Sequence, residues 1–381
     1  MAFQIPENVH GVTFVQDDTP GNHSLFDWWF KPTTGQSFIR FNCGWTEIAK
    51  TDPFGFGYAA GGNAVWDSGD TPVNTIERIV YAASASTVVC QADMSAVDNK
   101  YAGDGCGSSS RGYGFGTYYG TPSLSIFGLA FASDSSVYHA ADSQKPTCQY
   151  CYCCNSSLLG YSFGGSHAVD ASTYYSLSTI ENIAFATEAV SVQGHITGST
   201  TTDLYGCIAS GHSFNTTTKG FSLGGVNMSN NSWIFTTEVF SFLFSVSTDA
   251  SKISSALTKE RRSGGSVNST VSGYLIKGGE NSGAAYYTDT EKFNFATETS
   301  QALSNDYGYG IDDAASNNSS LQGFTMGGRI YNNSDPCNVI QSLMFSVDFV
   351  PTIAESALSV NRWMPYGFDT TDCNGFIFAL I

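Results

Sequence analysis

The residues with the clearest chemical potential are four cysteines near the middle of the chain. Cys148, Cys151, Cys153 and Cys154 lie within seven residues and include a Cys-x-x-Cys spacing. Four thiolates can bind zinc in a tetrahedron, which makes a metal site the first hypothesis. However, neighbouring residues of a strand point to opposite faces, and a closed zinc site usually takes its second pair of ligands from another turn. We therefore favour side-chain packing, with a metal site and a disulfide as the alternatives.

The register of the cysteines supports packing. Cys154 precedes Gly160 by six residues, and Cys106 precedes Gly112 by six. Both therefore occupy one position of a repeated unit, and Cys207 lies in a similar leading strand. Cysteine behaves as a small apolar residue where strands crowd together.

Other catalytic arrangements have little support. His195 and His212 are expected in surface loops, and neither belongs to a His-x-x-x-His spacing. No Gly-x-Ser-x-Gly places a serine nucleophile between a strand and a helix. Acidic pairs such as Asp17-Asp18 and Asp312-Asp313 could serve glycoside hydrolysis or calcium binding, but a chain with 33 carboxylates produces such pairs by chance. We expect no catalytic residue, no metal and no cofactor.

Aromatic residues recur in the segments that follow glycine doublets. Flat rings beside Asn, Asp and Ser suit stacking on sugars, and packing of the rings inside their own loops is the alternative. The candidate binding residues are Trp66, Tyr118, Tyr119, Tyr174, Tyr175, Tyr286 and Tyr287.

Charge and hydropathy exclude several partners. The formal net charge of −17 disfavours nucleic acid, whose binding proteins usually carry a clustered basic surface. No run approaches eighteen apolar residues, so we expect no membrane insertion. The opening residues lack the charged and apolar regions of a secretory signal.

An internal repeat organises the chain. A glycine followed by an aromatic residue recurs seven times, 48 to 60 residues apart, and most copies end in a Gly-Gly pair. This spacing suits a four-stranded sheet in each unit. The seven copies are Gly57-Tyr58, Gly112-Tyr113, Gly160-Tyr161, Gly220-Phe221, Gly273-Tyr274, Gly323-Phe324 and Gly375-Phe376.

A second element follows each doublet, alternates apolar with polar residues and ends on an aromatic, as in Ile180–Phe185. Its seventh copy lies near the other terminus, as Leu25–Phe30. The sequence therefore predicts an all-β, seven-bladed β-propeller in which Leu25–Phe30 and Gly375–Ile381 share one blade. Such sharing closes the ring and leaves no long free sheet edge.

The repeated residues have expected roles. The first glycine should let neighbouring backbones approach closely, and the doublet should allow positive φ at the turn that leaves the strand. The aromatic that ends the second element should pack between adjacent blades. By this reading Phe185→Ala would leave a cavity that costs about 3 to 5 kcal/mol.

The order of strand, Gly-Gly, loop and aromatic-ended strand resembles the kelch repeat, and residues 30–35 are similar to the kelch turn that follows that strand. Residues 160–165, Gly-Tyr-Ser-Phe-Gly-Gly, with Ile180–Phe185, look like the kelch-like repeats of bacteriophage virion proteins, especially those of cyanophages. The resemblance implies a protein of the phage particle, exposed on a tail, fibre or capsid.

These observations predict a non-enzymatic structural or adhesion protein located in the virion. Residues 1–21 would form an arm that docks on another virion protein or packs back on its own propeller, and residues 22–381 would form the propeller. The loops could bind host surface polysaccharide. A glycan-active enzyme and a kelch-type protein-interaction adaptor are the alternatives.

Overall fold

The computed structural model shows strands and turns and, in the residues it describes, no α-helix. Within those same residues no helix is long and apolar enough to cross a membrane. The described residues are 12–15, 18–19, 28–31, 36–41, 44–49, 56–64, 71–81, 87–93, 103–116, 124–131, 137–145, 148–170, 173–197, 209–229, 232–246, 249–279, 286–304, 310–319, 322–330, 336–348 and 357–369.

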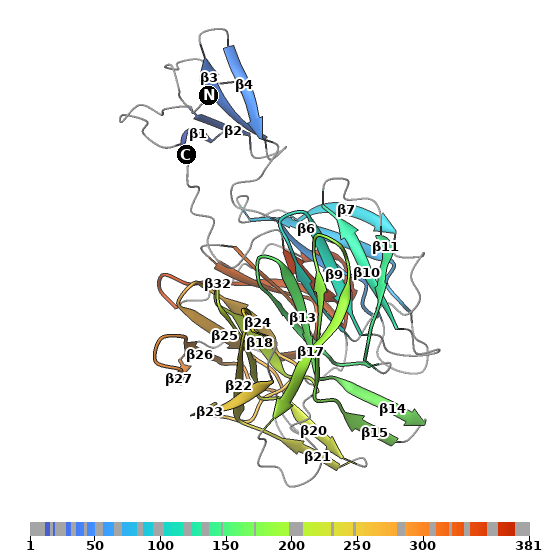
Figure 1. Cartoon of the computed structure of the whole chain (residues 1–381). Coiled ribbons are helices and arrows are strands. Elements are labelled where there is room, and N and C mark those ends of the chain that lie inside the picture. The colour runs from blue at the N-terminus through green and yellow to red at the C-terminus, as the bar shows by residue number, and fades with distance from the viewer. Residues whose placement is uncertain are drawn as a thin grey trace.

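Six four-stranded sheets, named blades 1 to 6, make up the main body (Figure 1). Blades 3 and 4 are joined by a short parallel pairing between their outer strands. From the innermost strand outward, the blades are: blade 1, β34 (Tyr366–Asp369), β5 (Phe56–Ala60), β6 (Thr75–Val80) and β7 (Thr87–Asp93); blade 2, β8 (Asp104–Gly107), β9 (Arg111–Phe115), β10 (Ser125–Ala130) and β11 (Val137–Asp142); blade 3, β12 (Tyr152–Asn155), β13 (Leu159–Phe163), β16 (Thr179–Ala184) and β17 (Val190–Thr197); blade 4, β18 (His212–Asn215), β19 (Lys219–Leu223), β22 (Glu238–Leu243) and β23 (Ala250–Ala256); blade 5, β24 (Gly265–Asn268), β25 (Ser272–Ile276), β26 (Thr290–Asn294) and β27 (Thr299–Leu303); and blade 6, β29 (Ala315–Asn318), β30 (Gln322–Met326), β32 (Cys337–Met344) and β33 (Ala357–Arg362).

The six inner strands contact one another in a closed cycle, in the order β34, β8, β12, β18, β24, β29 and back to β34. Strand β34 comes from the C-terminal part of the chain and pairs antiparallel with β5, with Tyr366 opposite Ala60 and Asp369 opposite Gly57. Blade 1 is therefore built from both ends of the described ring. A closed ring of radial sheets is a β-propeller-type fold, in which each sheet keeps only short, protected edges.

The predicted count of seven blades is not confirmed, since the cycle of inner strands closes with six. The predicted pairing partner of Leu25–Phe30, Gly375–Ile381, lies outside the described residues. Strand β2 pairs instead with its sequence neighbours in a separate sheet, which stands apart from the ring in Figure 1. This sheet consists of β1 (Val12–Val15), β2 (Trp28–Lys31), β3 (Gln36–Phe41) and β4 (Gly44–Ala49).

The repeat maps onto equivalent strands. The six described Gly-aromatic copies lie on the second strand of each blade, and the aromatic-ended elements form the third strand. The turn between the first two strands begins with Ser or Thr; in blade 3 the Ser156 hydroxyl accepts hydrogen bonds from the backbone N–H groups of Leu158 and Leu159. The same turn occurs at Ser108, Thr216, Ser269 and Ser319. We call the end of the ring with these turns the turn face and the opposite end the loop face.

The predicted packing of the aromatic residues between blades is confirmed. At every junction the ring that follows the third strand stacks on the ring beside the repeated glycine of the preceding blade, with centroids 4.8 to 5.6 Å apart. Each pair is nearly parallel, so the stacking is face to face with an offset. The six pairs are Phe131 with Tyr58, Phe185 with Tyr113, Phe244 with Tyr161, Phe295 with Phe221, Phe345 with Tyr274, and Tyr81 with Phe324.

The glycines have two different roles. Four of the five doublets have positive φ at both glycines, as expected; Gly164 and Gly165 have values of 48° and 96°. In blade 5 the two positive values belong to Lys277 and Gly278. The first glycine makes room for a side chain and not for a neighbouring backbone, which corrects that expectation. In four copies this side chain belongs to the preceding blade; at Gly57 and Gly220 the nearest is Tyr81 or Phe242 of the same blade. A Cβ on Gly273 would lie 2.2 Å from the Phe214 ring, and a Cβ on Gly323 would lie 2.4 Å from the Cβ of Val267.

Three of the six junctions also contain a buried ion pair. In each pair the cation lies on the segment that leads into a blade, and the glutamate lies on the third strand of the same blade. The cation also donates a hydrogen bond to a backbone carbonyl at or beside the doublet of that blade. The pairs are Arg362 with Glu77, Lys145 with Glu181 and Arg261 with Glu291, and the carbonyl acceptors are Gly61, Gly164 and Lys277. These junctions alternate with junctions that have Phe127, Phe240 or Gln341 in place of the glutamate.

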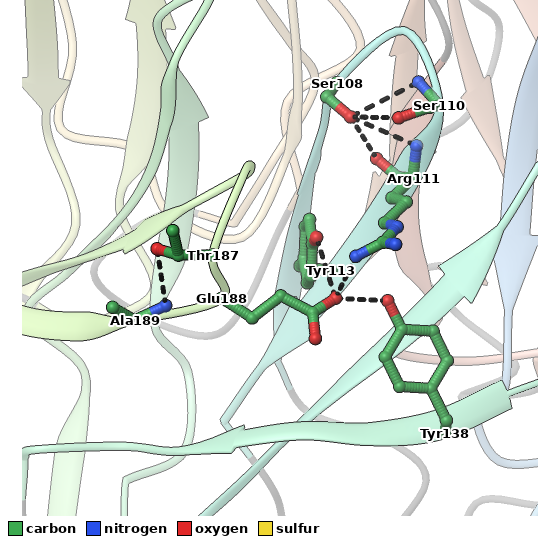
Figure 2. A network of polar contacts seen from close by, with 8 residues as sticks. All are labelled: Ser108, Ser110, Arg111, Tyr113, Tyr138, Thr187, Glu188 and Ala189. Carbon is green, nitrogen blue, oxygen red and sulfur yellow. Dashed lines mark hydrogen bonds and ion pairs between the residues drawn. The ribbon is translucent and has the colours of Figure 1, made fainter.

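On the turn face, acidic residues join blades through partly exposed contacts. Glu188 of blade 3 accepts hydrogen bonds from Arg111, Tyr113 and Tyr138 of blade 2, at 2.6 Å from the Arg111 Nη1 and 3.2 Å from the Tyr113 hydroxyl (Figure 2). Asp348 of blade 6 accepts from Tyr274 of blade 5 in the same way, at 2.7 Å.

Candidate functional site

A cavity of about 110 Å³ lies on the axis of the ring. All six inner strands contribute residues to its lining. The lining is mainly small and polar. It includes Asp104, Cys151, Cys153, Asn155, Ser213, Asn215, Ser266, Asn268, Asp313, Ser316, Asn318 and Asp369.

Four amide side chains and one carboxyl group gather where the axis meets the turn face. Asn155, Asn215, Asn268, Asn318 and Asp369 occupy the last position of their inner strands. The backbone N–H of Asn268 donates to the Asn318 Oδ1 at 2.7 Å, and that of Asn318 donates to the Asp369 Oδ2 at 2.8 Å. Each of these bonds joins neighbouring blades, so the side chains that line this mouth also hold it in shape.

The opposite mouth is formed by residues in the left-handed conformation. Tyr150, Ser210, Ser263, Asp313 and Met364 hold equivalent positions and have φ values between 52° and 58°. Such backbone is costly for residues other than glycine unless its surroundings fix it. The N–H of each of the last four donates to the carbonyl of the equivalent residue in the preceding blade, for example Ser210 to Tyr150 at 2.9 Å. A run of inter-blade backbone hydrogen bonds thus encircles most of this mouth.

Two carboxyl groups of the cavity are shifted toward their neutral form. Burial raises the pKa of Asp104 to about 7, although its carboxylate accepts from the backbone N–H of Cys153 at 2.9 Å and of Gly105 at 2.8 Å. Burial and the neighbouring Asp312 raise the pKa of Asp313 to about 6, against a hydrogen bond of 2.9 Å from the Trp363 indole. The cavity therefore combines these two carboxyl groups with hydroxyl and amide groups.

The cysteines pack as expected at the repeated position. A Cβ on Gly160 would lie 2.2 Å from the Cys106 sulfur, and one on Gly220 would lie 3.1 Å from the Cys154 sulfur. Cys148, Cys151 and Cys153 are buried as well, and all five are free thiols. In the described part of the chain, no three His, Cys, Asp or Glu side chains are grouped so that they could hold a metal ion.

Four of the predicted aromatic residues are described, and they lie on the loop face. Trp66, Tyr118 and Tyr119 lie outside the described residues. Tyr174 and Tyr175 lie on β15 (Thr173–Ser176), which pairs with β14 (Ser166–Asp170) in a hairpin of blade 3, and the side chain of Tyr175 is 36% exposed.

Tyr286 and Tyr287 are half-buried against cations. Arg329 donates a hydrogen bond of 2.7 Å to the Tyr286 hydroxyl. The guanidinium of Arg261 lies 4.9 Å from the centre of the Tyr287 ring. These contacts fix the two rings beside the doublet of blade 5. A binding role for any of the predicted aromatics stays a prediction.

A second hairpin lies against the first. It consists of β20 (Val226–Ser229) and β21 (Ser232–Phe235) of blade 4. The Ser176 hydroxyl donates to the Val226 carbonyl at 3.3 Å, and β15 and β20 are in contact. Both hairpins extend from the ring side by side in Figure 1. A two-residue pairing on this face joins β28 (Ile311–Asp312) and β31 (Arg329–Ile330).

Two sequence expectations about polar residues were wrong. His212 lies buried on the inner strand β18, not in a surface loop; its Nδ1 is 3.0 Å from the Ser266 hydroxyl, and burial lowers its pKa to about 3. His195 is exposed but belongs to strand β17. Asp312 and Asp313 are not a chance surface pair, because Asp312 is buried in an ion pair of 2.6 Å with Arg329 and Asp313 lines the cavity.

Sequence reasoning missed the axial residues, although a signal was present. Asn155, Asn215, Asn268 and Asn318 each stand five residues before a repeated glycine. Alignment of the units on those glycines would have placed the four amides at one level of the ring.

Comparison with known proteins supports the fold alone. No protein-family model and no curated protein matches the chain. A solved structure titled "Structure of YjhT" is similar, with a TM-score of 0.54 and 14% identity over 70% of this chain and 87% of YjhT. The all-β architecture and this likeness define a β-propeller-type protein.

Proposed function

We propose that this protein is a non-enzymatic binding component of a bacteriophage particle, which recognises its target through the loop face. The observation that carries the proposal is the pair of hairpins β14–β15 and β20–β21. They extend beyond the ring, support each other, and expose Tyr175 and Ile234, the latter at 44%. Rings and aliphatic side chains on loops that a rigid scaffold positions are typical of binding surfaces.

The virion location rests on the resemblance of the repeats to those of phage virion proteins. Residues 160–165 form the second strand and doublet of blade 3, and residues 180–185 include its third strand. The motifs quoted for the resemblance are thus the structural units of the ring. The acidic charge of −17 favours host polysaccharide or another virion protein over nucleic acid as the target.

Attachment to the particle is assigned to the N-terminal segment. The cycle of inner strands is complete without β1, the described strand of the predicted arm. Within this segment β1 pairs parallel with β2 at the edge of the separate sheet. An edge strand offers unpaired backbone groups to a strand of another protein.

Mass spectrometry of purified particles of the phage that encodes this chain tests the location. Absence of the protein from those particles would exclude a virion role. Binding to host cells tests the recognition. The Tyr175→Ala/Ile234→Ser variant should bind at least about tenfold more weakly, the effect of losing an interface anchor. Leu158→Ser, at an exposed residue of the turn face, is the matched control and should bind like the wild type.

A glycan-active enzyme is the second candidate, because Asp104 and Asp313 have raised pKa values inside a cavity. At about 110 Å³ the cavity is smaller than the 300 Å³ or more of an ordinary ligand pocket. Release of reducing sugar from host polysaccharide, lost in Asp104→Asn, would favour the enzyme over the binding protein.

A further inference from the structure

The outer strands of blades 3 and 4 pair with each other. β17 runs parallel to β23, with Ile196 opposite Ala250, so the two blades form one eight-stranded sheet. Ile196 and Ala250 are buried in one apolar cluster. The other four blades of the described ring are each a separate four-stranded sheet. Blades 3 and 4 also bear the hairpins β14–β15 and β20–β21, so the proposed binding surface stands on the two blades that share a sheet.

Two exposed hydrogen bonds strengthen this pairing. The backbone N–H of His195, on β17, donates to the Asp249 Oδ1 at 2.8 Å. The Gln193 Nε2 donates to the Val246 carbonyl at 2.8 Å. Asp249 and Val246 both lie in the segment between β22 and β23. We call these two bonds, together with the paired residues of β17 and β23, the outer-strand joint.

The joint is connected to the base of the first hairpin. Ser178 lies between β15 and β16, and its carbonyl accepts the backbone N–H of Ile196 at 2.8 Å. Its hydroxyl is 3.3 Å from the His195 Nδ1. The hairpins also meet directly, because the Ser176 hydroxyl donates to the Val226 carbonyl at 3.3 Å. The two hairpins are therefore linked twice, once to each other and once through β17 and β23.

We propose that Asp249 is a positioning residue of the loop-face surface, which holds β17 against β23 through His195 and thereby keeps the two hairpins in a fixed relation. The inference rests on the proposed function, since it concerns the same surface. A surface made of two separate loops loses relative freedom when it binds, and a surface that is already fixed loses less. The outer-strand joint thus favours binding from a distance.

Asp249 lies away from the surface that it supports. The turn between the third and fourth strands of blade 4 belongs to the turn face, because the Phe244 N–H donates at 2.9 Å to the carbonyl of Thr218 in the first turn of that blade. Asp249 follows Phe244 and directly precedes β23. Substitution of Asp249 therefore leaves the side chains of the loop face unchanged, and any effect on binding must pass through the joint.

The test is amide hydrogen exchange of the full-length protein, measured by mass spectrometry. In Asp249→Ala the peptides that cover β15 and β20 should exchange about fivefold faster than in the wild type, the effect of losing one hydrogen bond. The peptide that covers β25 in blade 5 should exchange at the wild-type rate, because the outer-strand joint does not include that blade.

Two variants separate positioning from a general loss of stability. Asp249→Asn keeps an oxygen that accepts the His195 N–H, so it should exchange like the wild type. Asp142→Ala is the matched control, because Asp142 is an exposed carboxylate at the end of β11, the outer edge of the blade 2 sheet. Unchanged hairpins in Asp249→Ala, equal acceleration of β25, or an Asp249→Asn variant that behaves like Asp249→Ala would overturn the proposal.

Binding to host cells distinguishes this inference from the proposed function. Asp249→Ala should bind about fivefold more weakly than the wild type, and Asp249→Asn should bind normally. Faster exchange of the hairpins with unchanged binding supports the positioning role of Asp249 and counts against recognition through the loop face. Weaker binding with unchanged hairpin exchange would overturn the positioning role.

Discussion

The ring of Tyr81 stacks on the ring of Phe324, with centroids 4.9 Å apart and planes inclined by 8°. Tyr81 follows the third strand of blade 1, and Phe324 lies on the second strand of blade 6. The contact that joins the two ends of the ring is therefore the same contact that joins every other pair of neighbouring blades. The pairing of strand β34 with β5 is the one additional contact that closes the ring.

The first prediction concerns that strand. A chain that ends at Asp369 keeps β34, whereas a chain that ends at Pro365 loses it and leaves β5 without its inner partner. We expect the shorter chain to melt at a much lower temperature than the longer one, because an open ring exposes sheet edges. Differential scanning calorimetry of both chains and the full-length protein provides the measurement.

If β34 closes the ring, the chain that ends at Asp369 should also resist proteolysis within blade 1. A single large loss of stability on removal of residues 370–381 alone would instead support the predicted seventh blade, which uses Gly375–Ile381.

The second prediction concerns an aromatic stack. Phe131 is 9% exposed and stacks on Tyr58 at 4.8 Å. Phe131→Ala should lower the free energy of unfolding by about 3 to 5 kcal/mol, the cost of a large cavity in a core. Phe185→Ala should cost less, because Phe185 is only partly buried at its junction. Urea denaturation measures the free energy of unfolding of both variants. Equal decreases would show that burial of the ring does not determine how much its removal destabilises the protein.

The third prediction concerns a glycine and the cysteine that fills the space beside it. Gly160→Ala should destabilise the protein, because the new Cβ would lie 2.2 Å from the Cys106 sulfur. Cys106→Ala removes that sulfur, so the double variant should recover part of the loss. A double-mutant cycle by urea denaturation gives the coupling, expected at about 1 to 3 kcal/mol. Additive effects would mean that the two residues do not share this space.

Sequence patterns predicted the parts of the fold that each unit repeats. A single unit shows its glycine doublet, the alternating pattern of its strands and the spacing of a cysteine from the repeated glycine. These local features were enough to predict the doublet turns, the aromatic-ended strands and the packing of Cys106 and Cys154. The number of blades did not follow, because the inner partner of β5 is chosen by ring closure between distant parts of the chain. The axial role of Asp313 and the burial of His212 were missed for the same reason: each depends on contacts from neighbouring blades, such as those of Trp363 and Ser266.

The fourth prediction concerns the buried ion pair of Arg362 and Glu77. The Glu77 carboxylate also accepts the backbone N–H of Ser359 at 2.6 Å. Glu77→Gln would leave the Arg362 guanidinium buried without a counter-charge, at a cost of about 3 to 5 kcal/mol.

The matched control is Glu298→Gln, which removes an exposed pair with Lys219 and should cost about 0 to 1 kcal/mol. Chemical denaturation at neutral pH compares the two variants. A loss in Glu77→Gln no larger than that in the control would mean that the buried pair adds nothing to the junction.

The last prediction concerns the Asp104 carboxyl and pH. Its pKa is raised from 3.8 to about 7 by burial, so the folded protein keeps a proton that the unfolded chain releases between these values. Stability is therefore unaffected by this group below about pH 4, falls as pH rises toward 7, and stays at the lower level above that range. Asp104→Asn should lack this part of the decline and be more stable than the wild type at pH 8. Asp142→Asn, at an exposed carboxylate, should keep the wild-type slope. Urea denaturation from pH 4 to 8 measures the difference, and a carboxyl-carbon NMR titration of Asp104 with a midpoint near 4 would contradict it.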